Sequence, residues 1–434
     1  MRDSYWLACA MAVLAAAAGV ACATSENDVE LSLAPDSGGS EAAIPDGGSV
    51  EDTDADADVD VDGLLCSKAG WCATSLPDAD LSMRDIWPLP GRAFAIAESQ
   101  TLGVKVLEWD DAEAKWKYID DSTQVEPGMG HYAGGIWAPN ESEVYYAVAP
   151  GYIYHGNRSA TPGAPWSWTR HRLEDNSHPG GAIDPEDGYP LYSQIGIRRP
   201  ALGVWGTSSG DVYAWFTNTI YRWKSVDGGA PGWVSEHVAD DSENPDEHLF
   251  FVAAGGTGPD DVWFSGARSR KWAACALAVR KTPAGYQRVA DGILPSTFQP
   301  CTPRAGTLMI GGSEGWLTDI QALAADQLVG LKGGGNVVRI SVAGDSYSVA
   351  LSTVPPALSK SKPWDSLSAV QGTPWLSGWG LVIRGTDVWD DGGYAISTTS
   401  MRGPLGRRVY RVRGASNTNL WAIGDGYALH KTTP

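Results

Sequence analysis

Two serine motifs and seven histidines are the residues whose types could support catalysis in this sequence. Both serine motifs match Gly-x-Ser-x-Gly, at residues 206–210 and 311–315. A serine hydrolase places this motif at a strained turn between a strand and a helix. The first match lies instead where other parts of the chain carry a hairpin loop, so we interpret it as a turn. The histidines lack the H-x-H and H-E-x-x-H spacings of metal sites, and we predict no catalytic residue, metal or cofactor.

Two further motifs indicate structure more than chemistry. Residues 58–63 match the first half of an EF-hand loop, but Ala69 stands at the twelfth position, where calcium requires a bidentate glutamate. Residues 225–233 resemble the Asp-box of sialidase-like propellers, lengthened by one residue. The Asp-box is a structural turn in that family, and the arginine motif of sialidases is matched only faintly, at residues 197–200.

The cysteines favour disulfide chemistry. Cys66, Cys72, Cys275 and Cys301 form an even set in a chain that we expect to be exported, where thiols oxidise. Three pairings are possible, and proximity in the sequence favours Cys66–Cys72 and Cys275–Cys301. A zinc site is the alternative, but neither pair has C-x-x-C spacing and no histidine cluster accompanies them.

The N-terminus has the pattern of a targeting segment. An apolar run at residues 5–21 follows Arg2 and is too short for a comfortable membrane span, so we predict a signal peptide at residues 1–21. Residues 19–22 resemble the lipobox of bacterial lipoproteins, which implies a lipid on Cys22 and anchoring to the outer membrane by that lipid alone. The alternative is ordinary cleavage after the A-x-A site at residues 21–23 and release as a secreted protein.

Residues 22–63 are predicted to be an acidic, flexible linker. Its residues 23–62 carry 13 Asp and Glu but no Lys or Arg, and such a composition buries too little apolar surface to fold. Removing this stretch and the Arg2–Asp3 pair from the total charge of −20 leaves 38 acids against 31 bases, a net charge of about −7. The remaining body, residues 64–434, therefore offers no basic footprint for nucleic acid.

The body repeats one phrase: an apolar strand with a central aromatic or aliphatic anchor, a tight turn and a second short strand. The clearest copy spans residues 419–430. Another short strand precedes most anchors, and a fourth often follows. The anchors are Phe94, Tyr145, Tyr213, Trp263, Leu328, Trp375 and Trp421, at steps of 51, 68, 50, 65, 47 and 46 residues.

Seven copies of about four short strands predict an all-β fold, a seven-bladed β-propeller. The phrase resembles those of the WD40, kelch and BNR propellers and of exported bacterial propeller lipoproteins. The alternatives are a parallel β-helix, whose repeat is shorter, and a sandwich, which needs no sevenfold phrase. The last copy ends after its third strand, and the segment near Trp71 precedes the first copy. We therefore expect residues near 71–76 to complete the last blade and close the ring. The repeated tryptophans are expected to pack between blades.

Two insertions, at residues 172–201 and 291–314, account for the long steps in the repeat. In a propeller both would share a face with the loops between second and third strands, where long loops on a rigid scaffold often bind partners. The binding candidates on this face are Arg268, Arg270, Lys271, Trp272, Asp184 and Asp187.

The function that this sequence favours is non-catalytic binding of a protein or glycan by a cell-envelope or secreted propeller. The alternative is a carbohydrate-active propeller, either a glycosidase or sialidase-like enzyme or a lectin. An enzyme should bring several carboxylates or arginines together on the axis of the ring, whereas a binding protein need not.

Overall fold

The chain divides into two units, Met1–Asp58 and Val59–Pro434. The computed structural model describes residues 66–433 except 130–131, 160, 162, 178–199, 226, 240–245, 271–272, 296–299, 313–314, 325, 360–361, 391–392 and 400–405. The predicted signal peptide, Cys22 and acidic linker lie outside the described residues, as do Asp184, Asp187, Lys271 and Trp272. No helix among the described residues is long and apolar enough to cross a membrane.

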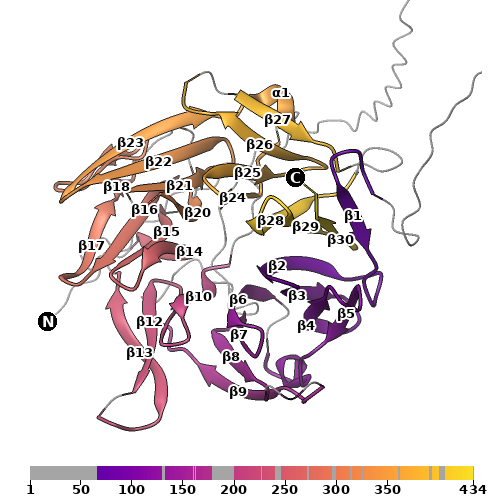
Figure 1. The fold of residues 1–434 in the computed structure, drawn as a ribbon. Helices are drawn as coiled ribbons and strands as arrows, with labels where there is room; N and C mark the ends of the chain where they lie inside the picture. The colour runs from indigo at the N-terminus through magenta and orange to yellow at the C-terminus, as the bar shows by residue number, and fades with distance from the viewer. Residues whose placement is uncertain are drawn as a thin grey trace, which may run out of the picture. The chain divides into compact units, whose positions relative to one another are not determined.

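The strands of the second unit form blades in chain order (Figure 1). Blade 1 contains β2 (Ser82–Leu89), β3 (Arg92–Ser99), β4 (Gly103–Asp110) and β5 (Lys115–Tyr118). Blade 2 contains β6 (Ala133–Asn140), β7 (Glu143–Val148), β8 (Tyr152–Asn157) and β9 (Ser167–Arg172). Blade 3 contains β10 (Leu202–Ser208), β11 (Asp211–Phe216), β12 (Thr219–Ser225) and β13 (Pro231–Val238). Blade 4 contains β14 (His248–Gly258), β15 (Asp261–Arg270), β16 (Ala273–Thr282) and β17 (Gly285–Ala290).

The remaining blades follow the same order. Blade 5 contains β20 (Leu317–Ala324), β21 (Gln327–Lys332), β22 (Asn336–Ala343) and β23 (Ser346–Thr353). Blade 6 contains β24 (Ser366–Val370), β25 (Thr373–Ser377), β26 (Val382–Asp387) and β27 (Gly393–Ser397). Blade 7 contains β28 (Val409–Ser416), β29 (Asn419–Gly424), β30 (Tyr427–Lys431) and β1 (Trp71–Thr74). Between the blades lie the hairpin of β18 (Gly292–Ile293) and β19 (Thr302–Pro303), the 3-10 turn η1 (Thr123–Val125) and the short α1 (Pro356–Ser359).

Seven four-stranded antiparallel sheets confirm the predicted propeller and its number of blades. The first strands of the blades surround the centre of the ring (Figure 1). Each packs against its neighbours in the order β2, β6, β10, β14, β20, β24 and β28, and β28 packs against β2 again. The apolar core is therefore divided among the interfaces between successive sheets, as a repeat-built fold requires.

β1 completes blade 7, as the unfinished last copy of the repeat predicts. It pairs antiparallel with β30 over its whole length. The side chain of Trp71 is fully buried, packs edge-on against Trp375 of blade 6 and donates a hydrogen bond to Ser397. Thr74 Oγ1 accepts a hydrogen bond of 3.0 Å from Trp116 Nε1 of blade 1. One short strand thus joins blades 6, 7 and 1.

Both predicted disulfides are confirmed. Cys66–Cys72 closes a small loop that leads into β1, in which Cys72 lies, with 4.0 Å between the two Cα atoms. Cys275–Cys301 links β16 to the second insertion, with a Cα–Cα distance of 5.9 Å. The first bond fixes the segment that enters the closing strand, and the second fixes an insertion to a blade.

Among the described residues, a polar triad occurs within the repeated phrase in four of the seven blades. In blade 4, Asp261 Oδ1 accepts hydrogen bonds of 2.9 Å from Trp263 Nε1 and 2.7 Å from Arg280 Nε. The Arg280 guanidinium lies 5.3 Å from the centroid of the Trp263 ring. Residues two apart on a strand share a face, and Arg280 lies opposite Trp263 in the register, so the triad needs only local pairing. The equivalent triads are Glu143–Tyr145–His155, Asp211–Tyr213–Arg222 and Asn419–Trp421–His430.

The triad in blade 7 makes stability depend on pH. His430 stacks on Trp421 with 4.0 Å between ring centroids, and burial lowers the pKa of His430 to about 4, which the charge of Asp111 opposes only in part. Above pH about 6.5 the imidazole is neutral in both the folded and the unfolded chain. Between pH about 6.5 and about 4 only the unfolded chain takes up the proton, so folding stability falls by roughly 3 kcal/mol in total.

We expect His430→Gln to reduce the slope of this part of the pH profile by about half, because burial lowers the pKa of His237 to about 4 as well and that histidine keeps its own contribution. Chemical unfolding measured every half pH unit from 4 to 8 checks the prediction, because above pH about 7 the two proteins should show parallel, nearly flat profiles. An unchanged slope in the variant below pH about 6.5 would contradict it.

The tryptophans of the repeat pack within and between blades, as predicted. Trp137, Trp263, Trp375 and Trp421 are buried, and Trp87 and Trp205 are partly buried against the interblade clusters. Trp166, which lies outside the phrase, also packs against other side chains of the propeller. Its ring stacks on Trp168, and the guanidinium of Arg158 lies 4.6 Å from its centroid.

Candidate functional site

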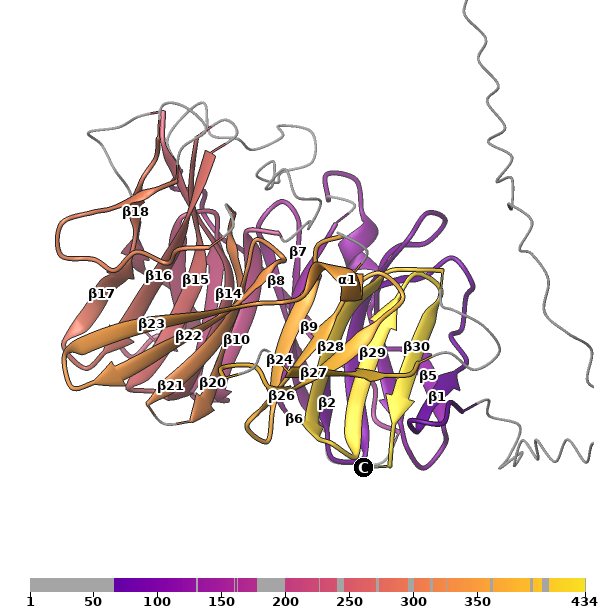
Figure 2. The same ribbon diagram turned by 90° about the horizontal axis from the view of Figure 1, so that it is seen from above.

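Blade 4 extends beyond the other blades on one face of the ring. This loop face carries the turns between second and third strands. β15 continues seven residues past its anchor Trp263, whereas β7 continues three residues past Tyr145. The four additional residues lengthen the hairpin by about 13 Å. We call the described parts of residues 265–276 and 291–316 the blade-4 extension; the β18 segment belongs to it (Figure 2).

A small apolar core lies where the blade-4 extension meets β14. Phe250 and Trp316 stack face to face at its centre, with 5.5 Å between ring centroids and an angle of 6° between the planes. Ala201, Val252, Ala267 and Ala274 surround these rings. The Cys275–Cys301 bond ties the β18–β19 hairpin to β16. The core and the disulfide therefore hold the described parts of the extension against blade 4.

A buried ion-pair cluster supports the base of the extension. Arg268 is fully buried and donates hydrogen bonds of 2.9 and 2.7 Å to the two carboxylate oxygens of Asp291, which begins the insertion. Its third bond, 3.0 Å long, reaches Glu247 just before β14. Arg304 and Arg288 lie at the edge of the cluster, each 3.3 Å from one of these carboxylates. A buried guanidinium is tolerated because its charge is paired and its donors are used.

The predicted binding residues thus have different surroundings. Arg268 is buried at the base of the extension, where it holds the insertion and β14 together. Arg270 is about one-third exposed, lies 3.6 Å from Glu247 and donates long hydrogen bonds to the carbonyl oxygens of Leu294 and Pro295. Lys271 and Trp272 follow it in the chain, outside the described residues.

The described start of the first insertion also reaches the loop face. Thr217, in the turn between β11 and β12, donates a hydrogen bond of 2.9 Å to Asp175 Oδ1. Asn176 Nδ2 donates to the Tyr221 hydroxyl at 3.0 Å, and that hydroxyl donates to the Glu174 carbonyl oxygen. This contact with a second-to-third-strand turn shows that the described start of the insertion, residues 174–176, lies on the loop face.

Four charged side chains meet near the centre of the ring, and sequence reasoning did not find them. Arg411 of blade 7 lies 3.0 Å from Asp85 of blade 1 and 2.6 Å from Asp319 of blade 5. Arg413 lies 3.2 Å from Asp85. Burial alone would lower the pKa of the Arg411 guanidinium, but the two carboxylates outweigh it and raise that pKa. We call Asp85, Asp319, Arg411 and Arg413 the axial cluster.

The axial cluster contains the residue types expected of an enzyme, but its charged groups form ion pairs with one another. Two carboxylates balance two guanidinium groups. The other carboxylate oxygens accept backbone hydrogen bonds from the first strands of adjacent blades, Asp85 from Ile136 and Asp319 from Leu367. These contacts indicate that the cluster aligns the blades.

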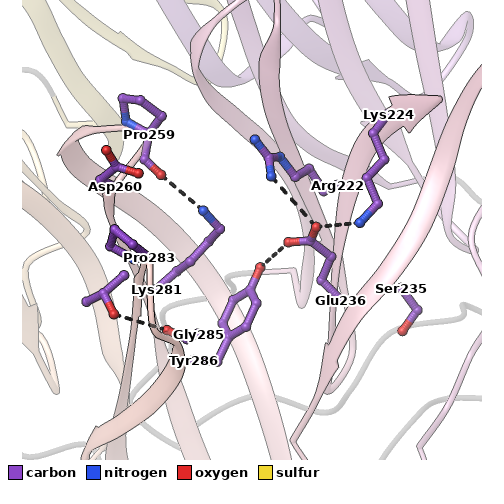
Figure 3. Close-up of a pocket in the computed structure, with 11 residues that line it drawn as sticks. Arg222, Lys224, Ser235, Glu236, Pro259, Asp260, Lys281, Pro283, Gly285 and Tyr286 are labelled. Atoms are coloured by element: carbon purple, nitrogen blue, oxygen red, sulfur yellow. Dashed lines mark hydrogen bonds and ion pairs between the residues drawn. The ribbon is translucent and has the colours of Figure 1, made fainter. Parts of the chain in front are cut away.

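A cleft of about 610 Å³ opens between blades 3 and 4 on the face opposite the loop face (Figure 3). Its walls come from the ends of β12 and β13 and from the two hairpin turns of blade 4. Glu236 accepts a hydrogen bond of 2.7 Å from Lys224 and one of 2.8 Å from the Tyr286 hydroxyl, which crosses from blade 4. Lys281 Nζ donates to the carbonyl oxygen of Pro259 at 3.0 Å.

The ionisation of the cleft follows from these contacts. Burial alone would raise the pKa of the Glu236 carboxyl, but the hydrogen bonds from Lys224 and Tyr286 outweigh it and lower that pKa. Burial, together with the charge and hydrogen bond of Glu236, raises the pKa of Tyr286 far above its ordinary value. Glu236 therefore stays ionised, and the Tyr286 hydroxyl stays a proton donor.

The described residues contain no group of three His, Cys, Asp or Glu side chains placed to hold a metal ion. No family model matches the chain, and no curated protein matches it. Solved structures with the same fold do. A structure of YCF48 bound to D1 peptide superposes with a TM-score of 0.51 at 12% identity, covering 86% of this chain and all of the other. The propeller domain of Cps50 (Swd1) from Myceliophteria thermophila has a TM-score of 0.50 at 10% identity, covering 83% of this chain and all of the other.

Proposed function

We propose that this chain is a non-catalytic propeller, exported to the cell envelope, that binds a protein partner through the blade-4 extension. The observation that carries the proposal is the construction of that extension. It is held by a small apolar core shared with β14, by a disulfide and by a buried ion-pair cluster. Rigid loops on a scaffold bind with little loss of conformational entropy.

Two further considerations support binding over catalysis. The axial charges pair with one another and with backbone groups of the blades, which is a structural use of them. In addition, the similar structure of YCF48 is of a complex with a peptide, so a propeller of this fold can hold a peptide ligand. The two disulfides support an oxidising compartment such as the cell envelope.

The experiment uses the full chain as bait for solubilised envelope proteins of its native host. In the test variant, residues 295–300 are replaced by Gly-Gly, which trims the insertion and retains Cys301. We expect one partner to be recovered by the unmodified protein and its recovery to fall at least about ten-fold with the variant. Quantitative mass spectrometry of the captured proteins gives the measurement.

A matched variant controls for general effects of shortening a loop. It replaces the turn between β12 and β13, residues 226–230, by Asn-Gly on the opposite face. The control should capture the same partner as the unmodified protein. Equal capture by all three proteins would reject the blade-4 extension as the binding site. Specific binding on a glycan array, with no protein captured, would favour the lectin alternative.

A further inference from the structure

The outer strand of blade 5 is a sheet edge without the usual protection against pairing. β23 is eight residues long, contains neither a charged residue nor a proline, and keeps a continuous register with β22. Proteins usually protect such an edge with a charge, a proline, a bulge or a short strand. The outer strands β5, β9, β13 and β17 carry charged residues, and β27 and β1 are five and four residues long. β23 therefore differs from the outer strands of the other blades.

Four residues of β23 direct their backbone N–H and C=O groups away from the ring. Ala343 and Ser346 close the turn between β22 and β23. At the other end of the strand, Val354 N donates to the carbonyl oxygen of Gly335 at 3.0 Å. Backbone groups alternate along a strand, so the even-numbered residues of β23 face β22. The odd-numbered residues face outward and are Tyr347, Val349, Leu351 and Thr353. Among the described residues β23 ends the sheet of blade 5, and it lies on the outer rim of the ring (Figure 1).

Packing against blade 4 holds this edge in place. The ring of Tyr347 packs edge-on against Trp263 with 5.9 Å between ring centroids, and its hydroxyl donates a hydrogen bond of 3.0 Å to Gln287. Val349 packs against the apolar cluster that blades 4 and 5 share, whereas Leu351 is 39% exposed. A strand that is already ordered loses little conformational entropy when a further strand pairs with it.

The sequence of β23 is complementary to itself when two copies run antiparallel with Ala350 on the two-fold axis. In this register Val349 lies opposite Leu351 of the second copy, and Ser348 lies opposite Ser352. Apolar side chains then meet apolar ones and hydroxyls meet hydroxyls, which are favourable cross-strand pairs. The outward backbone groups pair along the whole strand, with about eight hydrogen bonds between the copies.

The residues that flank β23 fit the same register. Asp345 would lie opposite Pro355 of the second copy, so its charge meets no other acid. Pro355 has no N–H to donate, and the new ladder therefore stops where β23 stops. Self-pairing of a charged outer strand would instead bring like charges together, as Arg170 and Arg172 would in β9.

We propose that β23 pairs antiparallel with β23 of a second copy of this chain, in the register centred on Ala350, and forms a two-fold symmetric dimer. Each side-chain pair away from the axis then occurs twice, as an isologous contact requires. The edge of one strand is smaller than a standard interface, so we expect dimers to accumulate only above roughly 10–100 µM.

Sedimentation equilibrium of the full chain, from about 5 to about 500 µM, tests the proposal. We expect a reversible equilibrium between monomer and dimer without larger species, because a two-fold contact closes on itself. Leu351→Lys should weaken dimerisation at least about ten-fold, since it places a charge opposite Val349 of the second copy. Val238→Lys is the matched control, because Val238 is 41% exposed at the end of another outer strand, β13. It should dimerise as the unmodified protein does, and both variants should keep the thermal unfolding profile of that protein.

A cysteine on the proposed axis tests the register. Ala350 would face Ala350 of the second copy at a position without backbone hydrogen bonds between them, where Cα atoms lie about 4.5 Å apart and a disulfide can form. Ala350→Cys should therefore give a covalent dimer on air oxidation, measured on a non-reducing gel. Thr169→Cys, at an exposed position of the outer strand β9, should not.

Three outcomes would overturn the proposal: a monomer up to about 500 µM, a dimer unaffected by Leu351→Lys, or equal cross-linking of the two cysteine variants. The first of them would assign the β23 edge to a strand of another protein instead of a second copy. The trimmed variant that lacks residues 295–300 should dimerise as the unmodified protein does, so this proposal and the proposed function fail independently.

Discussion

Deleting residues 64–78 is expected to lower the thermal stability of the propeller sharply, whereas deleting residues 23–62 should leave it unchanged. The first deletion removes β1, so that β30 becomes an edge with unpaired backbone N–H and C=O groups. It also removes contacts of β1 with blades 6 and 1. The second deletion removes only acidic linker, whose composition offers little apolar surface to bury. Differential scanning calorimetry of both proteins compares the two effects.

We expect the side chain of Trp71 to account for the largest part of the stability that the 64–78 deletion removes. Trp71→Ala empties a fully buried site at the joint between blades 6 and 7, so we expect it to cost about 3–5 kcal/mol of folding free energy. Trp379→Ala is the matched control, because that side chain is about half exposed, and we expect less than about 1 kcal/mol. Chemical unfolding measures both. If the 64–78 deletion and Trp71→Ala both melted like the unmodified protein, β1 would not close the ring.

The ring itself could be predicted because its determinants are local. An acceptor, an aromatic residue two positions later and a partner opposite on the next strand form each triad, and all three lie within about 20 residues of the chain, as Asp261, Trp263 and Arg280 do. Because the residues of such a triad are close in the chain, the triad recurs as a recognisable sequence pattern. The missing strand of the last copy was equally visible, since the final repeat ends early and Trp71 begins a strand with no earlier partner.

The sites were harder to predict because their residues come from distant segments. Arg268 belongs to a basic run beside an insertion, and this position in the sequence predicts an exposed side chain. Its burial depends on Glu247 and Asp291, which lie in two other connections. The spacing of these three residues in the sequence does not indicate that the connections carrying them lie together in the fold.

The cleft shows a second physical limit. Glu236 faces the next blade because a bulge adds one residue to β13 and breaks the alternation of inward and outward side chains. An alternating pattern read from the sequence cannot locate such a shift. Lys281 and Arg222 both approach the ring of Tyr213 only because blades 3 and 4 pack together there.

Arg411→Met is expected to destabilise the propeller by about 3–5 kcal/mol, because it leaves the buried carboxylates of Asp85 and Asp319 without their shared guanidinium. The methionine keeps most of the side-chain volume, so the loss reports charge more than a cavity. Arg170→Met is the matched control. It breaks an exposed ion pair with Glu126, which should contribute at most about 1 kcal/mol. Chemical unfolding at pH 7 gives both values.

A double substitution then shows whether the axial cluster acts as one unit. Asp319→Asn with Arg411→Met removes one charge of each sign, so less uncompensated charge stays buried than after Arg411→Met alone. We expect the double variant to lose less stability than the sum of the two single variants, by about 1–3 kcal/mol. Strict additivity would mean that Arg411 and Asp319 contribute separately. A loss below about 1 kcal/mol for Arg411→Met would mean that apolar packing between the first strands aligns the blades without the charges.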